Sequence, residues 1–340
     1  MKYIPKSVLL EINNICNFNC RHCYAEANSD KIELSFSTVQ NILKQLANIG
    51  VNNIAFSGGE PLLHSDLFKM IECAKIYKFN VIIDTNGSLI SQEKAHILKQ
   101  LGVDLINISL HGYYDYEHEY LTREKGSFEQ VLNVLEILLE NELNSGLNIA
   151  LNPMNYQNAH KILLIAVSYN VSSVSFFRIF QTGRAKAEKD LMLNLEAHKK
   201  VFSNIKGMIE RMGHPNIELY TELPYIYRKM EAERLYACGI GMESFIISNK
   251  GEIYLCNALR SPELVCGSIY DSKISEIWND SEVFNQIREI RSNPKRIIGI
   301  CSSCNYYNIC IGGCRACSYN IYGDFIHSDE KCWLQEKINF

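Results

Sequence analysis

Three cysteines near the N-terminus, Cys16, Cys20 and Cys23, are spaced so that one short loop can bring their thiolates onto a single soft metal centre. Three thiolates leave one iron of a cubane cluster without a protein ligand, and an open iron can bind a small molecule as well as carry electrons. The alternatives are a zinc loop or three reduced thiols. A zinc site usually has a second pair of ligands nearby, and no second close pair of cysteines follows this loop until the C-terminal part of the chain. The spacing therefore favours an iron–sulfur cluster.

The remaining cysteines are distributed unevenly. The chain has 13 cysteines, of which Cys73 stands alone and the later ones all lie between Cys238 and Cys332. In a reducing compartment such cysteines should not form disulfides. We expect two metal-bearing regions joined by a metal-free stretch, with Cys73 packed as a small buried hydrophobe on a helix.

Composition excludes several classes of protein. The chain has 340 residues, 47% of them hydrophobic, and a formal net charge of −4. No basic run indicates a nucleic-acid partner, and no apolar run is long enough to span a membrane. The N-terminus lacks the apolar core of a signal peptide, so we expect a cytoplasmic protein.

Hydrophobic periodicity predicts strands that alternate with helices. The expected strands cover 7–13, 51–56, 81–84, 104–110, 147–151 and 174–180. The expected helices cover 35–49, 66–77, 91–101, 128–142, 158–169 and 195–212. Such alternation predicts a parallel sheet with right-handed crossovers, in which the loops after the strands share one face. The cysteine loop and Ser57-Gly58-Gly59-Glu60-Pro61 would then be neighbours. Further along, a hairpin is expected around Gly251, and helices at 274–278 and 282–291.

Two of these motifs together resemble the radical S-adenosylmethionine (SAM) superfamily. They are the cysteine spacing followed by Tyr24 and the Gly-Gly-Glu-Pro loop after the second strand. The resemblance covers about residues 7–215 and implies a partial (β/α)6 barrel. It also implies that Cys16, Cys20 and Cys23 hold a [4Fe–4S] cluster whose open iron binds SAM, and that reduction yields a 5′-deoxyadenosyl radical.

The resemblance also implies ligands for SAM. Ser57, Gly58 and Gly59 would place backbone close to the cofactor, and Glu60 would accept a hydrogen bond from its ammonium group. Asn86 and Ser109 are candidates for the ribose, although both could be ordinary turn formers. Arg178 is a candidate for the carboxylate, with a structural ion pair as the alternative. His111 stands where relatives commonly have aspartate, so no role is carried over to it.

The C-terminal cysteines resemble a SPASM domain, the cysteine-rich extension of that superfamily. The resemblance implies two auxiliary iron–sulfur clusters. The first would be held by Cys238, Cys256 and Cys314, and the second by Cys301, Cys304, Cys310 and Cys332. An eighth ligand would come from Cys266 or Cys317, or the first auxiliary cluster keeps an open position. The expected domains are a barrel at 1–215, a bridge at 216–237 and a SPASM domain at 238–340.

This combination indicates an oxygen-sensitive enzyme that modifies a peptide or protein, most simply the maturation of a ribosomally made peptide. The implied partners are that substrate and a flavodoxin- or ferredoxin-type reductant. Since the first strand begins near residue 7, we expect leader binding to be weak, to be done by a separate leader-binding protein or to be unnecessary. The alternatives are a tetrapyrrole-pathway enzyme, a sulfatase-maturase-like oxidase and a non-catalytic electron carrier. The bond formed, the acid–base or radical-relay residue and the oligomeric state do not follow from the sequence.

Overall fold

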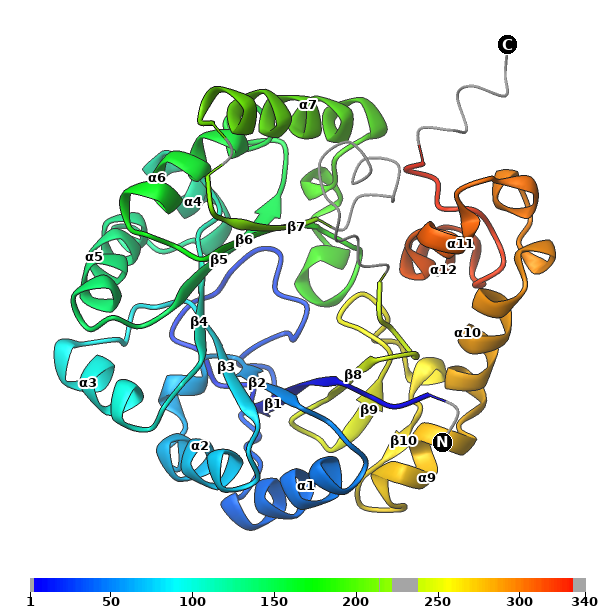
Figure 1. Cartoon of the computed structure of the whole chain (residues 1–340), viewed down its shortest axis with the longest axis horizontal. Helices are drawn as coiled ribbons and strands as arrows, with labels where there is room; N and C mark the ends of the chain where they lie inside the picture. Colours follow the sequence, from blue (N-terminus) through cyan, green and yellow to red (C-terminus); the bar gives the residue numbers. More distant parts are fainter. Residues whose placement is uncertain (1–2, 214, 222–237, 333–340) are drawn as a thin grey trace.

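One continuous, mostly parallel sheet, curved into an incomplete ring, organises the molecule. The computed structural model describes residues 3–213, 215–221 and 238–332. The sheet has ten strands in the order β10-β9-β8-β1-β2-β3-β4-β5-β6-β7. Figure 1 shows the strands around a central space with helices on the outside. The α/β barrel predicted for the N-terminal part is confirmed.

The N-terminal strands and helices lie close to their predicted positions. The strands are β1 (Ser7–Asn13), β2 (Asn53–Gly58), β3 (Asn80–Thr85), β4 (Leu105–Ser109), β5 (Ser145–Leu151) and β6 (Ser173–Arg178). The helices between them are α1 (Phe36–Asn48), α2 (Leu67–Ile76), α3 (Gln92–Gln100), α5 (Ser127–Glu140) and α6 (Ile162–Ser168), and α7 (Leu195–Arg211) follows β6.

Helix α1 illustrates why these segments fold as they do. Ser35 caps it, with the Thr38 N–H donating to Oγ of Ser35 at 3.2 Å. Val39, Ile42 and Leu46 recur on the face that packs on the sheet, and all three are fully buried. The parallel strands are apolar on their helix-facing side, so strand and helix bury one shared layer.

The sheet does not end with the barrel. Strand β8 (Ser244–Ile247) pairs with β1 in parallel, in a register that joins Ser7 to Ser244. Strands β9 (Glu252–Tyr254) and β10 (Gly267–Ser268) continue it as antiparallel neighbours. The hairpin predicted around Gly251 is confirmed, with Gly251 at φ +79°. Its attachment to the edge of β1 was not predicted, because pairing between distant segments leaves no local signal.

Several further elements were not predicted. Helix α4 (Asp115–Thr122) follows the loop after β4, a short strand β7 (Glu218–Thr221) pairs with β6, and α12 (Arg315–Tyr322) follows Cys314. Strand β7 lies inside the expected bridge at 216–237, most of which is outside the described residues. The domain boundaries therefore stay a prediction.

The C-terminal helices lie against one edge of the ring (Figure 1). They are α9 (Ile274–Asp280), α10 (Glu282–Ser292) and α11 (Tyr307–Cys310), together with α12. Trp278 and Phe284 are buried there, with their ring centres 4.9 Å apart, and the ring of Trp278 also packs against Phe245 of β8. This part therefore shares the core of the barrel. In the described part of the chain, no helix combines the length and apolarity needed to cross a bilayer.

Candidate active site

A cavity of about 670 Å³ fills the centre of the ring. The N-terminal cysteine loop forms one wall, with Cys16, Cys20 and Cys23 all facing the space. Another part of the wall comes from the C-terminal region and includes Cys238, Cys256, Cys310 and Cys314. The two cysteine groups that the sequence separates by more than half of its length therefore share one cavity.

The thiols of the cysteine loop suit a soft metal centre. Burial, together with the neighbouring thiols, raises the pKa of Cys20 to about 12, and burial raises the pKa of Cys16 to about 11. Without a metal these thiols stay protonated, whereas a bound iron deprotonates a coordinating thiol outright. Among the described residues no three Cys, His, Asp or Glu side chains lie close enough together to hold a single ion. The thiols of Cys16 and Cys23 lie close enough to Cys20 to raise its pKa, so the three donors converge on one place, as thiolate ligands of a shared [4Fe–4S] cluster would.

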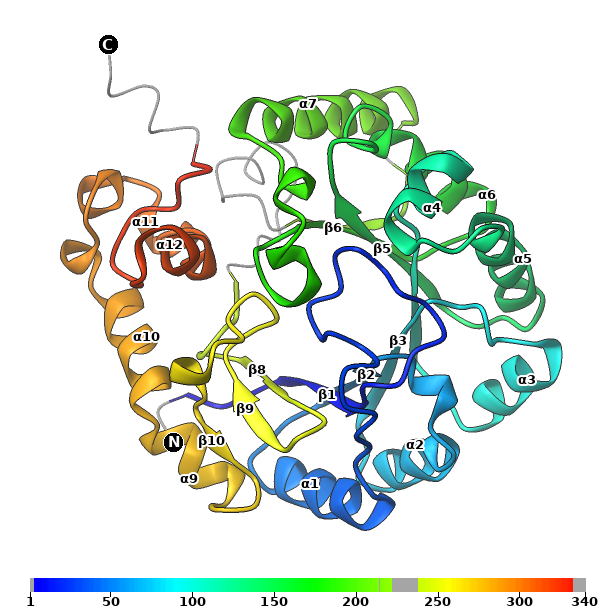
Figure 2. The same cartoon turned by 180° about the vertical axis from the view of Figure 1, so that it is seen from behind.

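The segment after β6 holds the cysteine loop in place. Nε of Arg184 donates to the carbonyl of Cys20 at 2.8 Å, and Nη1 donates to that of Ala27 at 2.8 Å. The backbone N–H of Arg184 donates to the carbonyl of Cys23 at 3.0 Å. A Cβ on Gly183 would lie 2.3 Å from that same oxygen, so only glycine allows this approach. Figure 2 shows the two segments side by side across the opening of the ring.

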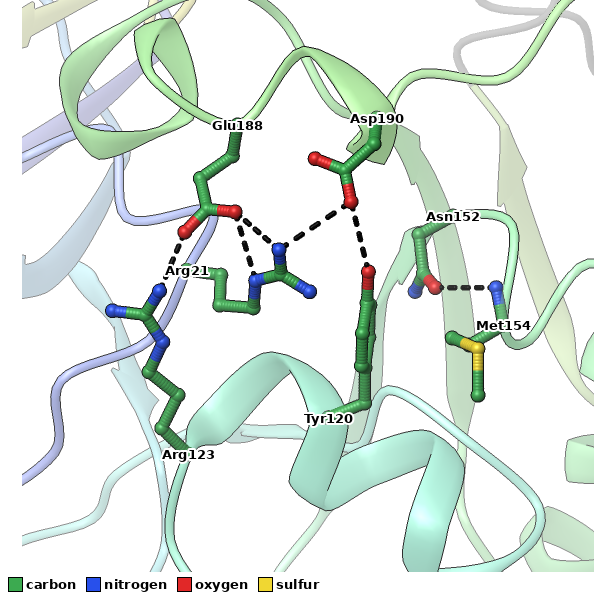
Figure 3. Close-up of polar contacts among 7 residues, drawn as sticks. All are labelled: Arg21, Tyr120, Arg123, Asn152, Met154, Glu188 and Asp190. Carbon is green, nitrogen blue, oxygen red and sulfur yellow. Dashed lines mark hydrogen bonds and ion pairs between the residues drawn. The ribbon is translucent and has the colours of Figure 1, made fainter.

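An ion-pair network fixes the same loop on its outer side (Figure 3). Nε of Arg21 donates to Glu188 at 3.0 Å, and Arg123, directly after α4, donates to the other oxygen of Glu188 at 2.5 Å. The guanidinium of Arg21 also lies 4.3 Å from the centre of the Tyr120 ring, whose hydroxyl donates to Asp190 at 3.2 Å. The hydrogen bond to Arg21 lowers the pKa of Glu188. Beside the network, the Met154 N–H donates to Asn152 at 2.9 Å and closes the turn after β5.

The glycine loop is built around the cysteine loop. Gly58 has φ +139°, and a Cβ there would lie 2.2 Å from the carbonyl of Asn13. A Cβ on Gly59 would lie 2.3 Å from the carbonyl of Ile15. Both glycines also line the cavity. Glycine is thus needed at both positions because the glycine loop lies against the backbone of Asn13 and Ile15. Contact of these glycines with a cofactor stays a prediction.

Glu60 is fully buried and already bonded within the protein. Its carboxylate accepts hydrogen bonds from Oγ1 of Thr85 at 2.7 Å, the Asn86 N–H at 2.9 Å and the Leu62 N–H at 3.1 Å. It fixes the loop after β3 and does not line the cavity. Its predicted bond to an ammonium group stays untested.

The other predicted cofactor residues line the cavity. Ser57 comes from β2, Asn86 follows β3 and Ser109 ends β4. Nδ2 of Asn86 donates to Oδ1 of Asn17 at 3.0 Å and lies 3.9 Å from the sulfur of Cys16. The loop after β3 therefore contacts the cysteine loop directly, as the shared face of a parallel barrel requires.

Arg178 at the end of β6 lines the cavity but is engaged by a carboxylate. Its two terminal nitrogens each lie 3.3 Å from one oxygen of Asp329, and both side chains are buried. Asp329 also accepts the Cys314 N–H at 2.9 Å. The alternative that the sequence left open, a structural ion pair, is present. The predicted role toward a carboxylate of SAM stays untested.

The C-terminal cysteines divide between two cavities. Cys238, Cys256 and Cys314 line the central one, while Cys301, Cys304 and Cys332 line a smaller neighbouring one. Cys310 lines both. Cys310 was expected in the second set only, and the two expected ligand sets stay a prediction.

The two candidates for an eighth ligand face neither cavity. Cys266 is buried, and its sulfur lies 3.8 Å from the carbonyl of Leu264. Cys317 is also buried, on α12, and burial raises the pKa of both thiols. Both thiols therefore lie in packed surroundings in this structure, and their assignment as ligands stays a prediction.

Three histidines that are distant in the sequence lie together on the cavity wall, and sequence reasoning did not group them. The rings of His22 and His111 lie 4.6 Å apart, and those of His111 and His118 5.6 Å apart. The Ala150 N–H donates to Nδ1 of His111 at 3.2 Å, and the His111 N–H to Nδ1 of His118 at 3.0 Å. Each accepting ring must therefore carry its hydrogen on Nε2. Burial lowers the pKa of His22 to about 4 and that of His118 to about 3, so the wall is uncharged.

Asp84 of β3 is a second residue that sequence reasoning did not single out. It is half-buried and is the one carboxylate among the described residues that line the cavity. Burial raises its pKa to about 6. Its only sequence signal is a charged residue at an inward-facing position of a buried strand.

Two family models match the chain. Residues 10–164 match the model described as "Radical SAM superfamily", and residues 238–305 match SPASM, the "Iron-sulfur cluster-binding domain". Both families predicted from the motifs are thereby confirmed.

Relatives of known name span most of the chain. An "AdoMet-dependent heme synthase" of Oleidesulfovibrio alaskensis is 26% identical, covering 96% of this chain and 87% of the relative. A "PqqA peptide cyclase" of Rhodopseudomonas palustris is 27% identical, covering 97% and 87%. The "Mycofactocin maturase MftC" of Mycolicibacterium smegmatis is 25% identical, covering 93% and 79%.

Solved structures share the fold. SuiB of Streptococcus suis bound to S-adenosylmethionine superposes with a TM-score of 0.79 at 18% identity, covering 97% of this chain and 78% of that one. The protein anSMEcpe with bound AdoMet gives 0.77 at 17% identity, covering 98% and 95%. At these identities the likeness concerns the fold alone.

Proposed function

We propose that this enzyme, which matches the radical SAM superfamily over residues 10–164 and carries a SPASM domain, modifies a peptide or protein. It abstracts a hydrogen atom from a substrate residue held in the central cavity. The [4Fe–4S] cluster and SAM, when bound, supply the 5′-deoxyadenosyl radical that takes this hydrogen. The residues proposed to hold the cluster are Cys16, Cys20 and Cys23. The proposed partners are a peptide, a flavodoxin- or ferredoxin-type reductant and a separate leader-binding protein.

The observation that carries the proposal is the position of the cavity. It is lined both by the loop proposed to hold the cluster and by C-terminal cysteines, so a substrate residue bound there would face both. The chain's own part is to position that residue and to exclude water, which the buried, uncharged histidine wall favours. Arg184 and the Arg21–Glu188 pair hold the reactive wall still.

A tetrapyrrole substrate is the second candidate, favoured by relatives that are named heme synthases. The charges of the cavity argue for the peptide instead. Tetrapyrroles of the haem pathway carry several carboxylates, which need cationic partners when buried. Arg178 and Arg184 are the only Lys or Arg residues among the described lining residues. The first is bonded to Asp329 and the second to backbone carbonyls. Asp84 adds a negative charge.

Deuterium transfer tests the choice of substrate. The reconstituted enzyme is reduced with SAM in the presence of a perdeuterated peptide library, and separately with a deuterated tetrapyrrole carboxylic acid. We expect deuterium in 5′-deoxyadenosine from the peptide library only. Transfer from the tetrapyrrole alone would overturn the peptide proposal in favour of the second candidate.

A further inference from the structure

The cavity contains one carboxylate whose surroundings lack a positive charge. Asp84 lies in β3 and faces the cavity, where Nδ2 of Asn107 donates to its Oδ1 at 2.8 Å. Among the described residues no lysine or arginine forms an ion pair with it. A carboxylate can accept about four hydrogen bonds, so a single amide donor leaves most of its capacity for a ligand.

The other charged groups near Asp84 are already paired or uncharged. Tyr24 of the cysteine loop is neutral, since burial raises its pKa well above the usual value. Glu60, beyond β2, is bonded to the loop after β3, and Glu11 of β1 forms an ion pair with Arg260. On the other side, Asn107 of β4 carries no charge. No neighbour therefore compensates a negative charge on Asp84.

Both guanidinium groups of the cavity are used elsewhere. Arg178 forms a bidentate pair with Asp329, and Arg184 holds the backbone of the cysteine loop. Moving either one to Asp84 would break a buried contact. The compensating charge must then come from a molecule that enters the cavity.

We propose that Asp84 is a recognition site for a cationic side chain, so that the substrate is a peptide segment that carries lysine or arginine beside the residue to be modified. The proposal rests on the proposed function and narrows its substrate class. An ammonium or guanidinium group would donate charge-assisted hydrogen bonds to the open carboxylate oxygens. The aliphatic stem of such a side chain would lie along the apolar part of the lining, which includes Leu9, Ala55 and Phe177.

A second observation agrees with this assignment. Burial raises the pKa of Asp84 to about 6, which is the behaviour of a carboxylate that has lost water without gaining a cation. A bound ammonium group would favour the ionised form and reverse that shift. Binding of the cation should therefore strengthen as the pH rises through about 6, because Asp84 must be ionised to attract it.

Binding of capped tripeptides tests the proposal. The anaerobically reconstituted full chain, saturated with SAM, is titrated with acetyl-Gly-X-Gly-amide, where X is lysine, arginine, norleucine or glutamate. We expect the lysine and arginine peptides to bind at least about tenfold more tightly than the norleucine peptide, as one charge-assisted bond provides. This preference should shrink at about pH 5, where Asp84 is largely protonated.

Matched variants assign the preference to Asp84. Asp84→Asn keeps the shape and the bond from Asn107, and should abolish the preference while the norleucine peptide binds as before. Asp271→Asn removes one negative charge from an exposed turn and should leave the preference intact. Iron content and the unfolding midpoint establish that each variant is folded and loaded.

Three outcomes would overturn the proposal. Equal binding of the lysine and norleucine peptides would show that Asp84 does not recognise a cation, while the proposal of peptide modification would be unaffected. A loss of SAM affinity of about tenfold or more in Asp84→Asn would assign the carboxylate to the cofactor instead. No binding of any of the four peptides, with deuterium transfer only from the tetrapyrrole, would defeat this proposal together with the proposed function.

Discussion

Burial shifts the pKa values of several single residues that line the cavity. Burial raises the pKa values of Cys16 and Cys20, which metal coordination would lower, and burial keeps the histidine wall neutral. Asp84 differs because burial raises its pKa while it stays open to the cavity. A residue of this kind costs stability and is retained where function needs it.

Replacing Asp84 should therefore stabilise the protein. The folded pKa of about 6 lies above the usual aspartate value of 3.8, so ionising Asp84 opposes folding. The cost is absent below about pH 4, grows as the pH rises and is complete above about 6. Asp84→Asn should raise the free energy of unfolding at neutral pH by roughly 1–2 kcal/mol, a figure reduced because the group is partly exposed to the cavity. Urea unfolding of the native chain and of Asp84→Asn at pH 7 and at pH 4 measures the difference in unfolding free energy. A stabilisation that persists at pH 4 would contradict the prediction.

Glu60 shows the opposite case, a buried carboxylate whose two oxygens both accept hydrogen bonds from the protein. In Glu60→Gln one oxygen becomes an NH₂ group that faces the N–H or hydroxyl donors of Leu62, Thr85 or Asn86. We expect a loss of about 1–3 kcal/mol in unfolding free energy, the cost of an unmade buried bond. Glu196→Gln, at an exposed position of α7, is the control and should change stability by less than about 0.5 kcal/mol. Equal unfolding midpoints for both variants would contradict this role of Glu60.

At the scale of elements, local patterns predicted more than long-range pairing did. The strands and helices of the barrel have clear periodicity, and the three-cysteine spacing needs no tertiary information. Helix α4 was missed because its start, Tyr113-Tyr114-Asp115-Tyr116, lacks an apolar repeat, and β7 because it is only four residues long. The clamp of Arg184 on the cysteine loop was also missed, since it joins residues 164 positions apart.

That clamp predicts a selective effect on metal content. In Arg184→Met the carbonyls of Cys20 and Ala27 lose their donors, so the cysteine loop loosens. Full loading corresponds to roughly twelve irons, three cubane clusters per chain, and we expect the variant to lose about four of them. Arg211→Met, at the exposed end of α7, should keep them all. Iron analysis and electron paramagnetic resonance of the reduced protein measure this, and full iron with an unchanged spectrum would exclude the clamp.

For the molecule as a whole, the barrel and the cysteine-rich end form one structure. Strand β8 extends the sheet from β1, and two buried ion pairs, Arg178–Asp329 and Glu11–Arg260, join the two parts. The sequence predicted both parts from their motifs. It could not predict how they join, because each contact depends on the folded positions of two distant segments.

Breaking one of these pairs should destabilise the whole molecule. Asp329→Asn leaves the buried guanidinium of Arg178 without its carboxylate and should cost about 3–5 kcal/mol in unfolding free energy. Combining Arg178→Met with Asp329→Leu should recover part of that loss. Glu289→Gln breaks an exposed pair with Arg296 and should cost less than about 1 kcal/mol. Urea unfolding of the iron-loaded chain measures all three, and equal costs for the buried and exposed pairs would contradict the account.

Formation of 5′-deoxyadenosine tests whether the chain cleaves SAM at a cluster held by Cys16, Cys20 and Cys23. The chain is reconstituted without oxygen, reduced with dithionite in the presence of SAM and analysed by mass spectrometry together with its iron content. We predict 5′-deoxyadenosine from the native chain and none from the triple variant of Cys16, Cys20 and Cys23 to alanine, which should retain about eight of about twelve irons. Stoichiometric zinc with little iron, or equal 5′-deoxyadenosine from the triple variant, would contradict the account.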